Sequence, residues 1–179
     1  MKLELELPDT MPLTADDFER LPHVEGFRLE LWEGNLIVAA AAQRAWHSEM
    51  AFRLSTLFRR QGLRTAMEVG VVVGRRGVPA PDVTVFRDGV EVDLDRSQFP
   101  AEDVFRVVEI VSPDSRDRDR VDKPVTYARA GIPEYWIVEQ ASDSFEAVVH
   151  EYRLTPTADG DVYTLVRTVN LSALEDGTS

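Results

Sequence analysis

The sequence of 179 residues contains no cysteine. Disulfides, thiolate metal sites and cysteine nucleophiles are therefore excluded, which favours a reducing compartment. No apolar run approaches the ~18 residues of a membrane-spanning helix. Residues 1–10 alternate apolar and acidic residues, whereas a signal peptide has a basic start and an apolar block. We expect a cytoplasmic protein with one domain over residues 1–179.

Lysine is scarce as well, with only Lys2 and Lys123 beside 18 arginines. The two basic residues are not interchangeable, because lysine carries a compact charge whose pKa changes readily on burial. Lys123 stands in "SRDRDRVDK", where every other base is an arginine. A lysine at this place is a candidate for chemistry, and chance is the alternative explanation.

Acidic residues outnumber basic ones, and the net charge is −12. This charge argues against a protein that coats nucleic acid through electrostatics alone. The balance is uneven, however, since residues 36–87 carry three acids and eight bases, net +5. Four arginines of this basic part are candidate phosphate contacts, although a solvated helix face explains them equally well: Arg53, Arg59, Arg60 and Arg64.

The spacing of apolar residues predicts a mixed β-sheet flanked by helices. Helices are expected over residues 14–21, 44–61 and 121–130. Strands are expected over residues 65–74, 81–86, 103–111 and 133–139, with one hairpin at 27–40 around "WEGN" and another at about 144–170. This order predicts an α/β or α+β fold with N-terminal and C-terminal β-hairpins.

One glutamate interrupts the most apolar predicted strand, "DVFRVVEIV". Side chains alternate along a strand, so Val107, Glu109 and Val111 share one face. A buried carboxylate without a partner costs several kcal/mol, so Glu109 needs a proton, a cation or a metal ion. Asp82 in "VPAPDVTVF" and Glu30 in "FRLELWEG" are also acids between apolar neighbours in predicted strands.

Three such acids and one unusual lysine form a candidate site. Mg²⁺ prefers a few carboxylates together with waters and a substrate phosphate, and it can activate water for phosphoryl transfer. The competing interpretation is that each acid pairs with an arginine in a structural salt bridge. We favour metal binding for the set as a whole.

Several motifs over residues 12–140 resemble a known family. They are "LELWEG", "AWHSEM", "PDV", "VVEIVSP" and "DRVDKPVTYARAGIPEYWIVE". In content and order they are similar to the Uma-type putative restriction endonuclease family of the PD-(D/E)XK nuclease superfamily. The resemblance implies a restriction-endonuclease-like fold, Mg²⁺- or Mn²⁺-dependent cleavage of DNA, and a homodimer with no membrane association.

The resemblance also assigns roles to individual residues. Asp82 matches the aspartate of the Pro-Asp motif, and Glu109 matches the acid of the second half-motif. Both would ligate the metal ion together with the backbone carbonyl of Ile110. Glu30 matches the acid of the early element and would bind the ion directly or through water.

The lysine of the superfamily motif is displaced in this sequence. Val111 fills the position two residues after the glutamate, and Lys123 matches the position from which this family supplies lysine on the next helix. Its ammonium would orient or help deprotonate the attacking water, or stabilise charge on the phosphate. The helical period places Lys123 opposite the stripe of Val121, Val125 and Ala128, so the sequence leaves open which face is buried.

Three further residues are candidates for supporting roles. His47 lies beside an apolar helix stripe and is either a packing residue or, by the resemblance, a support for the site or the substrate. Ser112 follows the Glu109 strand and either hydrogen-bonds near the site or caps the loop. Tyr127 is interpreted as a packing residue.

Two other functions stay open on the sequence. The net charge of −12 favours a non-catalytic nuclease-fold module for binding or assembly, because free-standing DNA binders are generally basic. A metal-dependent RNase would use similar chemistry.

Overall fold

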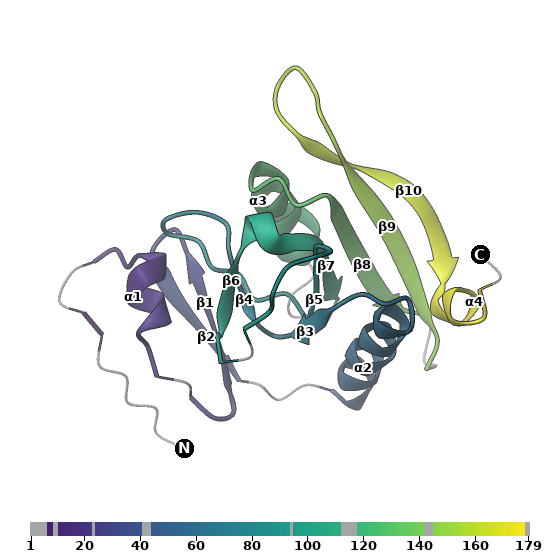
Figure 1. Cartoon of the computed structure of the whole chain (residues 1–179), viewed down its shortest axis with the longest axis horizontal. Coiled ribbons are helices and arrows are strands. Elements are labelled where there is room, and N and C mark those ends of the chain that lie inside the picture. The colour runs from purple at the N-terminus through teal and green to yellow at the C-terminus, as the bar shows by residue number, and fades with distance from the viewer. Residues whose placement is uncertain are drawn as a thin grey trace.

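A six-stranded mixed sheet forms the centre of the computed structural model, which describes residues 7–8, 11–22, 24–40, 44–93, 95–111, 118–141 and 145–177. The strands of this sheet are β3 (Thr65–Met67), β5 (Val83–Phe86), β7 (Val104–Ile110), β8 (Glu134–Gln140), β9 (Ala147–Thr155) and β10 (Val162–Asn170). Their order is β10-β9-β8-β7-β5-β3 (Figure 1). β7 is parallel to β8 and antiparallel to β5, so the Glu109 strand lies inside the sheet.

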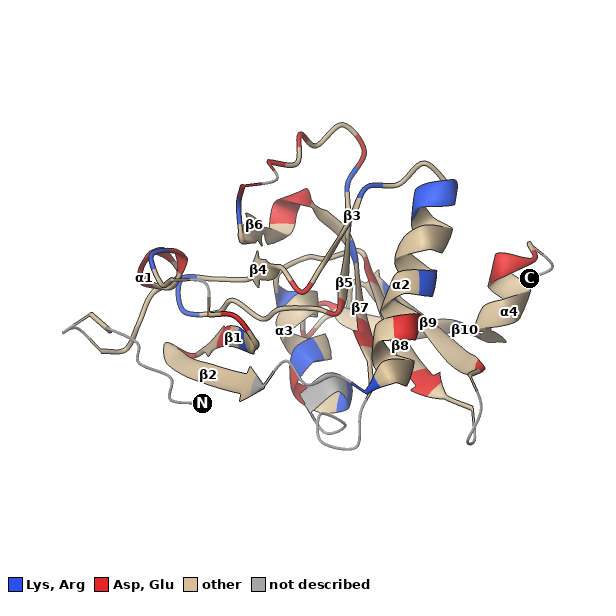
Figure 2. Ribbon diagram, turned by 90° about the horizontal axis from the view of Figure 1, so that it is seen from below, with Lys and Arg blue, Asp and Glu red and all other residues tan. Residues whose placement is uncertain are grey.

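Helices cover both faces of this sheet (Figure 2). α2 (Ala45–Arg60) and α4 (Leu171–Glu175) pack on one face, and α3 (Lys123–Arg129) packs on the other. Val108 and Ile110 of β7 face α2, whereas Val107 lies in the cluster with α3. Coverage on both faces explains why β7 reads as a nearly continuous apolar run.

The α2 layer follows the predicted helical spacing. Met50, Leu54 and Phe58 are fully buried, and they recur every four residues along α2. The ring of Phe58 meets Trp136 of β8 edge to face, with 5.3 Å between the ring centroids. This contact joins the helix to the middle of the sheet.

The N-terminal hairpin is a separate two-stranded sheet of β1 (Phe27–Trp32) and β2 (Asn35–Ala40). Glu33 and Gly34 have φ values of 51° and 82°, the left-handed conformation that a two-residue hairpin turn requires. α1 (Ala15–Glu19) begins with a capping box and packs on this hairpin. The predicted hairpin and first helix are therefore confirmed, and so is the C-terminal hairpin of β9 and β10.

The prediction of one strand over residues 65–74 is wrong. The chain turns at Glu68, whose φ is 55°, and β3 ends before it. β4 (Gly70–Val72) then pairs with β6 (Gln98–Pro100) in a second two-stranded sheet. A 3₁₀ turn at Ala101–Asp103 follows β6. Gly70 allows this route, because a Cβ there would lie 2.7 Å from a methyl carbon of Val78.

The expected α/β class, a mixed sheet flanked by helices, is confirmed by this arrangement. Among the described helices, none has both the length and the apolar character that crossing a bilayer would require.

The packing of α2 predicts unequal effects of two phenylalanine substitutions. Phe58→Ala would leave a cavity against Trp136 and should lower the free energy of unfolding by about 3–5 kcal/mol. Phe52→Ala on the same helix removes a ring that is 63% exposed and should change it by no more than about 0.5 kcal/mol. Urea denaturation of both variants measures the difference, and equal losses would contradict the assigned core.

Candidate active site

Asp82 immediately precedes β5, and Glu109 lies on the neighbouring strand β7. The register of β5 and β7 pairs Val83 with Val108, and one further step along the same register brings Asp82 to Glu109. Directly opposed residues on one face have Cβ atoms about 4.5–5.5 Å apart. Both side chains are buried in the interior, so the two predicted carboxylates are neighbours away from bulk water.

Lys123 reaches this pair from the first position of α3. One turn of π-helix at Arg118–Asp122 precedes it. Its Nζ lies 2.7 Å from Glu109 Oε2 and 3.8 Å from Glu30 Oε1, and its side chain is 4% exposed. The inward face of α3 is therefore the lysine face, while Val121 and Val125 are exposed to solvent.

Tyr127, one turn further along α3, contacts the same acid. Its hydroxyl donates to Glu109 Oε1 at 2.8 Å, and its ring packs against Tyr135. Burial raises the pKa of the Tyr127 hydroxyl, and the negative charge of Glu109 raises it further, so the group stays a hydrogen-bond donor. The interpretation as a packing residue missed this second role.

Glu30 enters the site from β1 and brings Arg28 with it. Arg28, Glu30 and Trp32 share one face of the strand, because they lie two residues apart along it. Arg28 donates to Asp82 Oδ1 at 2.7 Å, to Glu30 Oε1 at 3.2 Å and to the carbonyl of Ala80. Sequence reasoning missed this arginine, although its place two residues before a buried acid was the available signal.

His47 closes the other side of Asp82 from the first turn of α2. Its Nε2 lies 3.2 Å from Asp82 Oδ2, and the backbone amide of Ile110 donates to the same oxygen at 2.6 Å. Among the described residues His47 Nδ1 has no hydrogen-bond partner. His47 thus touches one of the predicted metal ligands, which matches a supporting position.

Asp82 and Glu30 are held in their charged form. Burial raises the pKa of Asp82, but the hydrogen bond from His47 and the charge of Arg28 outweigh burial and lower it overall. Burial likewise opposes ionisation of Glu30, and the charges of Lys123 and Arg28 lower its pKa below the ordinary value. Both carboxylates are therefore ionised at neutral pH.

The donor set fits a hard divalent cation. Carboxylate oxygens are the ligands that Mg²⁺ prefers, and three carboxylates lie in one buried cluster with Arg28 and Lys123. In the described part of the chain no three His, Asp or Glu side chains are grouped closely enough to hold an ion alone. An ion bound here would keep several waters, as Mg²⁺ commonly does.

The arginines predicted to contact phosphate lie elsewhere. Arg53 binds Glu175, Arg59 binds Thr65, and Arg64 donates to the carbonyl of Val90. Arg59 lies twelve residues after His47 on α2, about 18 Å along the helix axis.

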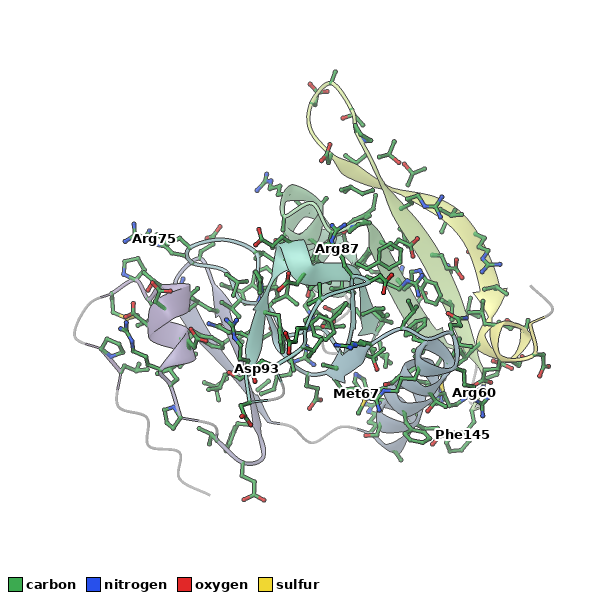
Figure 3. All side chains as sticks on the ribbon, in the orientation of Figure 1. Arg60, Met67, Arg75, Arg87, Asp93 and Phe145 are labelled. Carbon is green, nitrogen blue, oxygen red and sulfur yellow. The ribbon has the colours of Figure 1, made fainter. Side chains whose placement is uncertain are left out.

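The exposed arginines Arg60, Arg75 and Arg87 are spread along the long axis of the molecule in Figure 3. A phosphate role for the four arginines of the basic part stays a prediction. Ser112 lies outside the described residues.

Residues 15–175 match the model of the Uma2 family, whose description is "Putative restriction endonuclease". The chain belongs to this family. The match extends past the region of the sequence motifs and includes the C-terminal hairpin. Membership of Uma2 supports a nuclease, that is, a hydrolase acting on nucleic acid.

The fold of this Uma2 protein is similar to a crystal structure from Anabaena variabilis, which is described as a putative nuclease belonging to DUF820. The TM-score is 0.58 and the sequence identity is 20%, over 92% of this chain and 98% of the other. This similarity shows a shared fold. No curated protein matches the sequence.

The lowered pKa of Asp82 predicts how the Uma2 chain responds to acid. A carboxyl with a depressed folded-state pKa contributes stability above its unfolded pKa of about 3.9, and loses it progressively as pH falls toward the folded value. Asp82→Asn should therefore cost roughly 1–3 kcal/mol at pH 7. The difference from wild type should shrink between about pH 4 and pH 2.5. Urea denaturation at several pH values measures it, and a constant difference would contradict the assignment.

Proposed function

We propose that this protein is a Mg²⁺- or Mn²⁺-dependent endonuclease that hydrolyses phosphodiester bonds in DNA. The main support is one arrangement: Asp82 accepts a hydrogen bond from the backbone amide of Ile110, the residue after Glu109, and Lys123 lies 2.7 Å from Glu109. Two carboxylates and an ammonium in one buried cluster are the groups that metal-assisted phosphodiester hydrolysis needs. Membership of a family described as restriction endonucleases agrees with this chemistry.

Asp82 and Glu109 would hold the ion, together with the backbone carbonyl of Ile110. Glu30 would assist from β1, because its Oε1 lies 3.8 Å from Lys123 in the same cluster. A bound Mg²⁺ supplies positive charge at the phosphate and makes water a better nucleophile at neutral pH.

Lys123 has the position of a group that serves the attacking water or the phosphate. Its ammonium is held against Glu109, the acid next to which the reaction would occur. From there it can orient a water molecule and stabilise negative charge as it develops on the phosphate oxygens. The site is water-poor, so each of these electrostatic effects is stronger than it would be at the surface.

Tyr127 and His47 act through the two metal-binding acids. The Tyr127 hydroxyl fixes one oxygen of Glu109, while Lys123 contacts the other. His47 and the Ile110 amide fix one oxygen of Asp82. Carboxylates whose orientation is set before the substrate arrives lose less entropy when the reaction complex forms.

A non-catalytic binding or assembly module is the second candidate. One observation favours it: each of the three carboxylates already forms an ion pair with Arg28 or Lys123 without a metal ion. The net charge of −12 points in the same direction. Under this alternative the cluster stabilises the fold, and added metal has no place to bind.

A homodimer belongs to the proposal as well. Duplex DNA presents two strands of opposite direction, and two copies of the site related by a two-fold axis would match that symmetry. Light scattering of the purified protein with and without duplex measures the assembly.

Cleavage of plasmid and linear DNA tests the site directly. With Mg²⁺ or Mn²⁺ present, Asp82→Asn, Glu109→Gln and Lys123→Met should each reduce the rate by roughly 10²-fold or more, the usual loss when one such group is removed. Asp88→Asn and Glu102→Gln change exposed acids near the same strands and should keep wild-type activity. Cleavage that persists in all three site variants would reject the assignment, and an RNA panel run alongside defines the substrate.

Calorimetric titration separates the two candidate functions without relying on activity. The wild type should bind Mn²⁺ with a measurable heat, and Asp82→Asn should weaken that binding because one of two carboxylate ligands is lost. The Glu102→Gln variant is again the matched control. Absence of binding at millimolar metal would favour the non-catalytic module.

A further inference from the structure

Arg28 and His47 are the most exposed side chains of the cluster. The side chains of Glu30, Asp82, Glu109 and Lys123 are 1–6% exposed, whereas those of Arg28 and His47 are 19% and 14% exposed. A molecule approaching from solvent therefore meets Arg28 before it meets the carboxylates. Neither the family motifs nor the proposed mechanism gives this arginine a role.

The guanidinium of Arg28 bridges two acids that the proposed function assigns to the metal ion. Nη1 contacts Asp82 Oδ1 at 2.7 Å, and Nη2 contacts Glu30 Oε1 at 3.2 Å. The planar fork of arginine matches such paired oxygens. A divalent ion ligated by Asp82 would compete with Arg28 for the same carboxylate and would repel its charge.

We propose that Arg28 stands in for the divalent ion before the ion binds, and that it then exchanges Asp82 for a phosphate of the nucleic acid. This inference rests on the proposed function. The exchange requires only side-chain rotation, because β1 is anchored to β2 along its length and Leu31 bonds the backbone of Val78. A released guanidinium is weakly hydrated and binds phosphate through two parallel hydrogen bonds, so the phosphate replaces the partner that Arg28 has given up.

Two consequences follow from one displaced side chain. Metal affinity in the absence of substrate is reduced, since the ion must first displace Arg28. Substrate and ion also assist each other, because the phosphate holds the arginine away from Asp82. Coupling of this kind is reciprocal in the two binding equilibria.

Titration with Mn²⁺ alone tests the first consequence. Arg28→Gln removes the competing charge and should bind Mn²⁺ about tenfold more tightly than wild type, while Arg28→Lys, which cannot bridge two carboxylates with a planar fork, should fall between them. Arg96→Gln is the control, because it removes an exposed arginine paired with Glu19 and should leave the affinity unchanged. Arg28→Lys retains the charge that the buried acids require, so it supplies the answer if Arg28→Gln does not fold.

Binding of a short DNA duplex tests the second consequence. With Ca²⁺ in place of Mn²⁺ and the duplex verified intact afterwards, the wild-type plot of log K against log salt should be steeper than that of Arg28→Gln by about 0.9, the effect of one phosphate contact. An equal slope, or Mn²⁺ binding by Arg28→Gln and Arg28→Lys no tighter than wild type, would overturn the role of Arg28.

These outcomes differ from a failure of the proposed function itself. If the wild type binds no Mn²⁺, or if Asp82→Asn binds it equally well, the metal site is absent and the role of Arg28 falls with it. If binding depends on Asp82 but Arg28→Gln gains nothing, only the role of Arg28 is rejected.

Discussion

The charge of Glu109 in the middle of the central sheet is the constraint on which the rest of the site depends. Removing a carboxylate from water has a large free-energy cost, and only close partners with good geometry offset it. Lys123 and Tyr127 supply two of those partners, both from α3. The orientation of α3 follows from this demand, because the helix turns Lys123 and Tyr127 inward and leaves Val125 exposed, as Val121 is in the turn before it.

The alternation of side chains along a strand made the face of Glu109 predictable. The helical period alone could not show whether Lys123 faces inward. Alternation along β7 was sufficient to put Glu109 on one defined face, since a strand has only two faces. On α3 the apolar stripe and the lysine face were both reasonable choices. The deciding factor was the buried carboxylate of Glu109 on β7, which pairs with Lys123 and which no local pattern in the helix contains.

The salt-bridge interpretation and the active-site interpretation of the acids describe the same atoms. Asp82 does pair with an arginine, as the simpler interpretation required, and it also accepts a hydrogen bond from Ile110, the residue after Glu109. The sequence could not identify Arg28 as that partner, because β1 and the Asp82 segment come together only through tertiary packing. The break between β3 and β4 was hidden for a related reason: Glu68 adopts a left-handed conformation that its residue type does not favour.

The hairpin of β1 and β2 has a consequence for how firmly the molecule holds together. Glu30 and Arg28 belong to this two-stranded sheet, whereas Glu109 belongs to the six-stranded one and Asp82 directly precedes its strand β5. The charged pairs therefore connect two separate sheets. Any change in the ionisation of these few groups alters how firmly the hairpin is held to the central sheet. It also alters the reactivity of the cluster, so the same side chains determine both properties.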